Sequence, residues 1–242
     1  MKLLFVQLPV QDPSWESSRA NVPLAAGYLA AWAEKLGLLS REDWTILPSQ
    51  VVDYASDRGL IEAITEAAPD LVAFSIYLWN LERSLHIATE IAKELPRARL
   101  IAGGPEIVEG MPIFERSPFH SLVEGEGEPA FATLLGDLKR GKPLEKTYKS
   151  SGELELVELP NPYLAGILPL EPDTPIHLET MRGCPANCGY CYYGKNFSGV
   201  RKMRREDVYD LVDRACKVGV RELYLMDPSF QATEDLSDRL LS

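Results

Sequence analysis

Residues 71–104, LVAFSIYLWNLERSLHIATEIAKELPRARLIAGG, decide the fold of the N-terminal part of this chain. They begin with an apolar run at 71–77 that is typical of a buried strand. Apolar residues then recur at helical spacing over 81–95, and a helix is expected to end before Pro96, which lacks the N–H that a helix interior requires. A second apolar run follows at 99–102. A strand, a helix and a strand in this order predict two parallel strands joined by a crossover helix.

The same alternation extends over residues 1–142. Further strands are predicted at 3–8, 45–52 and 121–123, and further helices at 25–32 and 128–138. Five such strands are typical of an α/β, flavodoxin-like or Rossmann-like doubly wound domain, with a parallel sheet covered by helices on both faces. The ligand of such a domain is expected outside the carboxyl ends of the strands, near the point where the strand order reverses.

Residues 143–174 break this pattern, because four prolines fall within a short span of them. Several large apolar side chains lie among the prolines, so we expect an ordered linker and not a free tether. A new unit is predicted to begin at Pro175 and to extend to residue 242. Its expected elements are a strand at 176–180, a helix at 205–217 capped by Gly219, a strand at 222–226 and the start of a helix at 235–241.

Composition and charge exclude several classes of protein. The 242 residues have a formal net charge of -11, which disfavours broad binding to nucleic acid. No apolar run reaches the roughly 18 residues needed to cross a bilayer, and the apolar N-terminus reads as a buried strand and not as a secretion signal. Three of the four cysteines fall within eight positions. This clustering favours a metal site in a reducing cytoplasm over a disulfide framework.

The three clustered cysteines have the spacing CxxxCxxC, at Cys184, Cys188 and Cys191. An iron–sulfur cubane needs thiolates from several directions, so the chain must wrap around it. Gly183 and Gly189 permit the unusual backbone angles that such wrapping requires. With three local thiolates and four irons, one iron would lack a protein ligand. The spacing favours a 4Fe–4S cluster with an open iron.

Other uses of these cysteines are weighed against the cluster. Structural zinc needs four ligands, and the remaining candidates are Cys216 and His177. Cys216 falls beside Val212 and Ala215 in the predicted helix, so we expect it in the core. His177 alternates with two apolar residues on its strand and belongs either to a core or to a lumen. A disulfide or redox pair is a further alternative.

The phrase ETMRGCP at 179–185, followed by Cys188 and by Tyr190-Cys191, resembles the signature of the radical S-adenosylmethionine superfamily. In that family the amino and carboxylate groups of S-adenosylmethionine chelate the open iron, and one electron then cleaves the sulfonium to a 5′-deoxyadenosyl radical. The resemblance implies that Tyr190 lies near the adenine. It also makes Asp227, at the end of the second strand, the candidate for the methionine amino group. The alternative is a turn aspartate at a strand end.

The N-terminal domain lacks the phosphate-binding motifs GxGxxG and GxxxxGK[ST], which disfavours a dinucleotide or a nucleoside triphosphate. Its phrases at 22–29, 73–80 and 103–106, with GEGE at 125–128, instead resemble the cobalamin-binding domain that is often fused before a radical S-adenosylmethionine barrel. The cobalamin contacts that this resemblance implies are Ser75, Tyr77, Trp79, Asn80, Gly103, Gly104, Pro105, Gly125 and Glu126.

These residue types suit a bulky cofactor. Ser75 and Asn80 flank a strand end, where their oxygens can bond amides or a phosphate, and the glycines leave room for a tail to approach the backbone. The alternative is that the glycines only form tight turns. The DxHxxG motif is absent, and none of the three histidines, His86, His120 and His177, has its setting. We therefore expect cobalt without a histidine ligand from this motif.

The resemblance implies a function for the whole protein. Residues 175–242 have room for about two βα units of a TIM-type barrel. The chain is thus expected to be a truncated or split part that does not turn over alone, with a second chain as a candidate to complete the barrel. The expected reaction is methyl transfer to an unactivated carbon of a small molecule, with a flavodoxin- or ferredoxin-type electron donor and no membrane partner.

Three alternatives to this function were weighed. A methylthiotransferase is disfavoured because no cysteine precedes Cys184. A non-catalytic module that carries cobalamin or a cluster, and a zinc-stabilised structural protein, remain alternatives.

Overall fold

A computed structural model describes residues 1–10, 21–108, 110–150, 154–172, 174–186, 188–191, 193 and 199–229. The chain divides into two compact units, residues 1–153 and 154–242.

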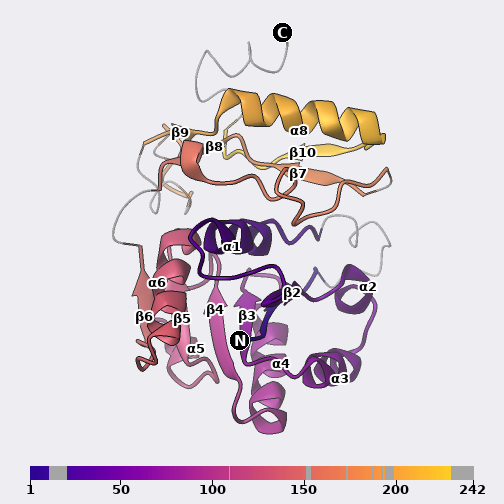
Figure 1. Ribbon diagram of the computed structural model, residues 1–242. Coiled ribbons are helices and arrows are strands. Elements are labelled where there is room, and N and C mark those ends of the chain that lie inside the picture. The colour runs from indigo at the N-terminus through magenta and orange to yellow at the C-terminus, as the bar shows by residue number, and fades with distance from the viewer. Residues whose placement is uncertain are drawn as a thin grey trace. The chain divides into compact units, whose positions relative to one another are not determined.

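Unit 1 is built on a parallel sheet of six strands in the order β2-β1-β3-β4-β5-β6 (Figure 1). The strands are β1 (Leu3–Val6), β2 (Trp44–Ile46), β3 (Leu71–Ser75), β4 (Arg99–Gly103), β5 (Ser121–Glu124) and β6 (Thr147–Lys149). The first five have the flavodoxin-like order, which confirms the predicted doubly wound α/β fold. β6 pairs with β5, so the sheet continues beyond residue 142, where the sequence predicted the domain to end.

Helices cover both faces of this sheet, as the alternation of side chains along each strand requires. They are α1 (Leu24–Lys35), α2 (Ser49–Val52), α3 (Asp57–Ala67), α4 (Leu81–Glu94), α5 (Pro112–Glu115) and α6 (Gly127–Lys139). Leu4 and Val6 join one core cluster with residues of α2, α3, α4 and α5. Phe5 points the other way, and its ring lies 5.8 Å from that of Phe131 in α6.

The strand predicted at 45–52 is wrong in its second half. β2 ends at Ile46, and residues 49–52 form the short helix α2. Pro48 precedes this helix and has no N–H to donate to a ladder, so the strand cannot continue through it. Helix α3 was not named from the sequence, although Ser56 caps it by accepting the N–H of Gly59.

Unit 2 contains one parallel strand pair joined through a helix. Its elements are the 3-10 helix η2 (Leu156–Glu158), β7 (Ile176–Leu178), β8 (Met181–Arg182), β9 (Arg201–Lys202), α8 (Arg205–Val218) and β10 (Leu223–Leu225). β7 pairs with β10 in parallel, and β8 pairs with β9 in antiparallel. Gly219 caps α8 with a φ of 91°, as predicted. The helix predicted at 235–241 lies outside the described residues.

The proline-rich segment belongs in part to unit 2. Arg201 and Arg204 donate to the backbone carbonyls of Leu154 and Val157, which ties the start of this unit to β9 and the residues after it. The phenol of Tyr163 accepts the N–H of His177 at 3.0 Å, and burial raises the pKa of Tyr163 to about 12. These contacts hold Leu154, Val157 and Tyr163 against the strands of unit 2 and the residues that follow β9.

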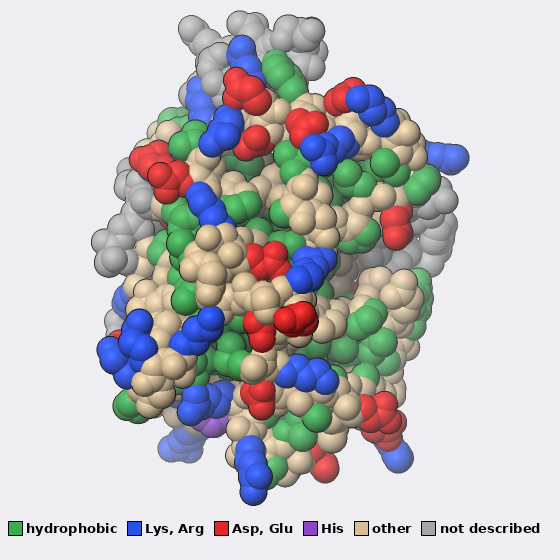
Figure 2. All heavy atoms as spheres, in the orientation of Figure 1, with side chains coloured by type: hydrophobic (Ala, Val, Ile, Leu, Met, Phe, Trp, Pro, Cys, Tyr) green, Lys and Arg blue, Asp and Glu red, His purple; other side chains and the backbone are tan. Residues whose placement is uncertain are grey.

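No helix among the described residues is both long enough and apolar enough to cross a bilayer. On the face shown in Figure 2, acidic and basic side chains are interspersed, with apolar side chains between them.

Candidate functional site

The carboxyl ends of β3, β4 and β5 bring the predicted cobalamin contacts of unit 1 together. Ser75 at the end of β3 is the register partner of Gly103 at the end of β4. Gly103 is in turn the partner of Val123, and β5 ends at Glu124, directly before Gly125. Residues from three separate phrases of the sequence therefore form one edge, the position at which ligands bind in this fold.

An aromatic pair lies just beyond β3 at this edge. The rings of Tyr77 and Trp79 are stacked, with centroids 4.6 Å apart and planes 8° apart. Trp79 is 53% exposed and Leu78 between them is 75% exposed. Consecutive exposed side chains of this size leave a flat apolar surface in contact with water, which is typical of a ligand or interaction site.

Asn80 has a different environment from the aromatic pair before it. It is fully buried, and its side chain forms hydrogen bonds with three backbone groups. Its Oδ1 accepts the N–H of Tyr77, and its Nδ2 donates to the carbonyls of Leu8 and Ser75. The structure therefore gives Asn80 contacts within the protein.

The glycines of this edge have two distinct roles. Gly104 has a φ of +116°, and a Cβ there would lie 2.4 Å from the carbonyl oxygen of Ile76, so this glycine is required by backbone packing. Gly125 has a φ of +79°, but a Cβ there would meet no atom within 4 Å. Open space thus lies beside Gly125 and not beside Gly104. Of their neighbours, Pro105 is exposed and Glu126 is buried directly ahead of α6.

A polar group at the end of β1 was missed by the sequence analysis. Gln7 donates to the side-chain oxygen of Asn21, and the amide of Asn21 donates to a carboxylate oxygen of Asp53 at 3.2 Å. Burial raises the pKa of Asp53, against the hydrogen bond from Asn21, which lowers it. β1 lies at the strand-order reversal, and this location was the signal that could have found Gln7.

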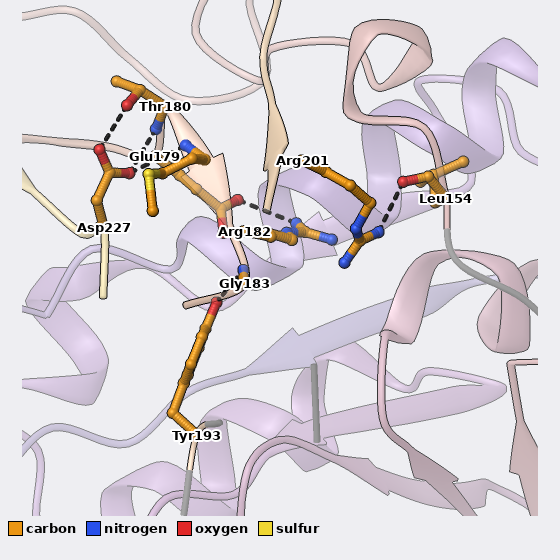
Figure 3. A network of polar contacts seen from close by, with 9 residues as sticks. Leu154, Glu179, Thr180, Arg182, Gly183, Tyr193, Arg201 and Asp227 are labelled. Atoms are coloured by element: carbon orange, nitrogen blue, oxygen red, sulfur yellow. Dashed lines mark hydrogen bonds and ion pairs between the residues drawn. The ribbon is translucent and has the colours of Figure 1, made fainter. Parts of the chain in front are cut away.

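In unit 2, the cysteine loop starts and ends on the β8–β9 pair. Met181 and Arg182 are register partners of Lys202 and Arg201, so residues 183–200 form a closed loop. Inside this loop the N–H of Gly183 donates to the phenol of Tyr193 at 3.2 Å (Figure 3). Burial raises the pKa of Tyr193.

A polar network surrounds the entry to this loop (Figure 3). The guanidinium of Arg182 donates to both carboxylate oxygens of Glu179 at 3.0 Å, and both side chains are largely buried. The carboxylate of Asp227, after β10, accepts the N–H groups of Thr180 at 2.7 Å and Met181 at 3.1 Å, and also the hydroxyl of Thr180. Asp227 thus links the end of β10 to the end of β7.

The three loop cysteines are free thiols, with Cys188 exposed and Cys184 and Cys191 half-buried. No three His, Cys, Asp or Glu side chains in the described ranges are grouped closely enough to hold a metal ion. Support for a metal here comes from the donor types and their spacing.

The structure also gives the environments of Cys216, His177 and Tyr190, the remaining residues of unit 2 that the sequence analysis singled out. Cys216 is exposed, so its assignment to the core is wrong: the buried positions of α8 are Leu211 and Ala215, and Cys216 lies one residue beyond that face. His177 is half-buried between the buried Ile176 and Leu178, its ring lies 5.7 Å from that of Tyr224, and burial lowers its pKa. Tyr190, the predicted adenine contact, is 93% exposed.

Comparison with known proteins supports the assignment of unit 1. Residues 21–135 match the B12 binding domain family. The chain is 29% identical over 240 residues to the cobalamin-dependent radical SAM methyltransferase TokK of Streptomyces tokunonensis. It is 27% identical over 246 residues to the 2-(S-pantetheinyl)-carbapenam-3-carboxylate methyltransferase of Streptantibioticus cattleyicolor. Each alignment covers 86% of this chain and 34% of the relative.

The fold has a counterpart among solved structures. The cobalamin-dependent S-adenosylmethionine radical enzyme OxsB, with aqua-cobalamin and S-adenosylmethionine bound, matches with a TM-score of 0.74 at 18% identity. That match covers 100% of this chain and 37% of OxsB. The chain spans about a third of the length of the curated relatives it matches.

Proposed function

Because residues 21–135 match the B12 binding domain family and the chain is similar to a cobalamin-dependent radical S-adenosylmethionine methyltransferase, we propose that the chain is the part of such an enzyme that binds cobalamin and a 4Fe–4S cluster. The observation that carries the proposal is the convergence of the predicted cobalamin contacts at the carboxyl ends of β3, β4 and β5. Methyl transfer to an unactivated carbon of a small molecule is the proposed reaction of the whole protein.

The residues at this edge fit a large, flat cofactor. The exposed ring of Trp79, stacked on the half-buried ring of Tyr77, offers an apolar surface, and the open space beside Gly125 admits a bulky group close to the backbone. Burying such aromatic surface stabilises a complex by roughly 25 cal/mol per Å² of apolar area. Ser75, Gly103 and Pro105 complete the proposed contact surface.

The donor set of unit 2 fits an iron–sulfur cluster. Cys184, Cys188 and Cys191 would supply three thiolates, and soft thiolate ligands are those that such clusters use. The network of Arg182, Glu179 and Asp227 would hold the start of the loop while the thiols bind. When bound, cobalamin supplies the carrier of a methyl group, and the cluster with S-adenosylmethionine supplies a radical that activates a carbon.

S-adenosylmethionine, the electron donor and the substrate would make contacts beyond those of cobalamin and the cluster. Exposed Tyr190 is proposed to cover the adenine of S-adenosylmethionine, and Asp227 to lie close to its amino group. A flavodoxin- or ferredoxin-type protein would supply electrons in the cytoplasm, and a TIM-type barrel, completed by further sequence or by a second chain, would hold the substrate.

Anaerobic purification and reconstitution test this proposal. The chain is loaded with iron, sulfide and hydroxocobalamin, and iron, sulfide, zinc and cobalt are counted per chain. We expect about four irons and one cobalt. C184A, C188A and C191A should each lose iron and retain cobalt, whereas C216A, the matched control, should retain both. A colourless protein rich in zinc would contradict the cluster, and a protein without cobalt would contradict the cobalamin site.

A further inference from the structure

The side-chain amide of Asn80 is not free to bind a ligand, although its residue type suggests such a contact. A primary amide carries two N–H donors, and both are used here, towards the carbonyls of Leu8 at 2.9 Å and Ser75 at 3.1 Å. Its oxygen accepts the N–H of Tyr77 at 2.9 Å, and the residue is fully buried. Asn80 therefore has no donor left for a cofactor and no surface to offer it.

These bonds join two strands at the strand-order reversal. Leu8 follows β1 and Ser75 ends β3, and the two strands are neighbours in the sheet although Leu8 and Asn80 are 72 positions apart. The backbone of Asn80 takes part as well, because its N–H donates to the carbonyl of Tyr77 and its carbonyl accepts the N–H of Ser84 in α4. One side chain thus fixes both ends of the loop formed by residues 76–80.

The opposite side of this loop is held by β4. The N–H of Ile76 donates to the carbonyl of Gly103 at 2.7 Å, and the α-carbon of Gly104 lies close against the backbone of Ile76. Between the two fixed points the loop carries the half-buried Tyr77 and the exposed Leu78 and Trp79. The apolar surface is therefore held from β1 on one side and from β4 on the other.

We propose that Asn80 is a positioning residue that preorganises the loop 76–80 for cobalamin without touching the cofactor. This inference rests on the proposed function of unit 1. Fixing a flexible backbone costs conformational entropy, so a loop that is ordered before the ligand arrives loses less of it on binding. The ordered loop would hold the stacked ring of Trp79 in the position in which it contacts the cofactor.

The test compares N80A with S84A in hydroxocobalamin titrations of the full chain, well below the melting temperature of each variant. Ser84 is an apt control because it lies four residues further on, is fully buried, and its hydroxyl has no hydrogen-bond partner among the described residues. We expect N80A to weaken binding by about tenfold, the loss expected for roughly one buried hydrogen bond, and S84A to bind like the wild type. In the cobalamin-free chain, amide exchange at residues 77–80 should quicken in N80A only.

A double-mutant cycle separates positioning from general stability. In a W79A background the N80A change should weaken binding far less than it does in the wild type, because the surface it positions is gone. N80S, which loses both amide donors and introduces no buried charge, replaces N80A if that variant does not fold. Wild-type affinity for hydroxocobalamin in N80A and in its replacement variant would overturn the inference. So would affinity losses of W79A and N80A that simply add in the double mutant. Either result would leave the proposed function intact. Absence of cobalamin binding by the wild type would overturn both.

Discussion

A Cβ atom on Gly183 would lie 1.6 Å from the carbonyl oxygen of Gly199, so the two ends of the cysteine loop touch through a glycine that no other residue can replace. Gly183 also has a φ of +89°, a conformation that side chains strongly disfavour. We predict that G183A separates β8 from β9 and removes iron binding after reconstitution. Iron content and amide exchange at residues 181–183 measure this effect.

Gly189 offers the control within the same loop. A Cβ there would meet no atom of the described residues within 4 Å. The φ of Gly189 lies outside the left-handed region, so the expectation that this glycine supplies an unusual backbone angle is wrong. G189A should therefore retain iron at the wild-type level. Equal iron content in G183A and G189A would show that the contact with Gly199 does not shape the loop.

Asp227 should stabilise the entry to the cysteine loop. D227A removes three hydrogen bonds to Thr180 and Met181, which we expect to destabilise unit 2 by about 1–3 kcal/mol and to accelerate amide exchange at both residues. D213A is the matched control, because the ion pair of Asp213 with Lys217 is exposed on α8. Solvent screens such exposed pairs, so removing this one should change stability little. Similar exchange in the two variants would count against a structural role for Asp227.

The raised pKa of Asp53 predicts a pH-dependent gain in stability from D53N. A carboxyl group whose folded-state pKa lies above its ordinary value of 3.8 stabilises the fold fully below that value, and this stability is lost as pH rises through the folded pKa. D53N lacks this loss and should still accept the hydrogen bond from Asn21. It should match the wild type at pH 3.5 and exceed it at pH 7.

Urea unfolding followed by tryptophan fluorescence measures this difference, because all four tryptophans lie in unit 1, at positions 15, 32, 44 and 79. A D53N variant that is less stable than the wild type at pH 7 would mean that the carboxylate has a stabilising partner in its ionised form.

Strands β1, β3, β4 and β5 and helices α1, α4 and α6 were predictable because each is a local pattern. Fully buried strands such as β3 and β4 read as unbroken apolar runs, and α4 ends where Pro96 requires. The pattern failed at residues 49–52, where a short apolar run fits a strand and a helical turn equally well. Only the position of Pro48 distinguishes them.

The candidate site was predictable in location but not in the role of each side chain. The phrases around Ser75, Gly103 and Gly125 indicated a shared edge, since carboxyl ends of parallel strands meet. The roles of Asn80 and Asp227 depend on partners far away in the sequence, at Leu8 and Thr180. No local pattern contains such a pairing, so the family resemblance suggested ligand contacts for both without indicating these partners.

Hydrogen exchange of the wild-type chain, measured with and without hydroxocobalamin, tests whether cobalamin binds at the carboxyl edge of the unit 1 sheet. We predict that cobalamin slows exchange at residues 75–80, 103–106 and 124–127, which lie at this edge. Residues 97–99 and 119–121, at the opposite edge, should exchange as before. Protection at the opposite edge, or at neither edge, would contradict the cobalamin site.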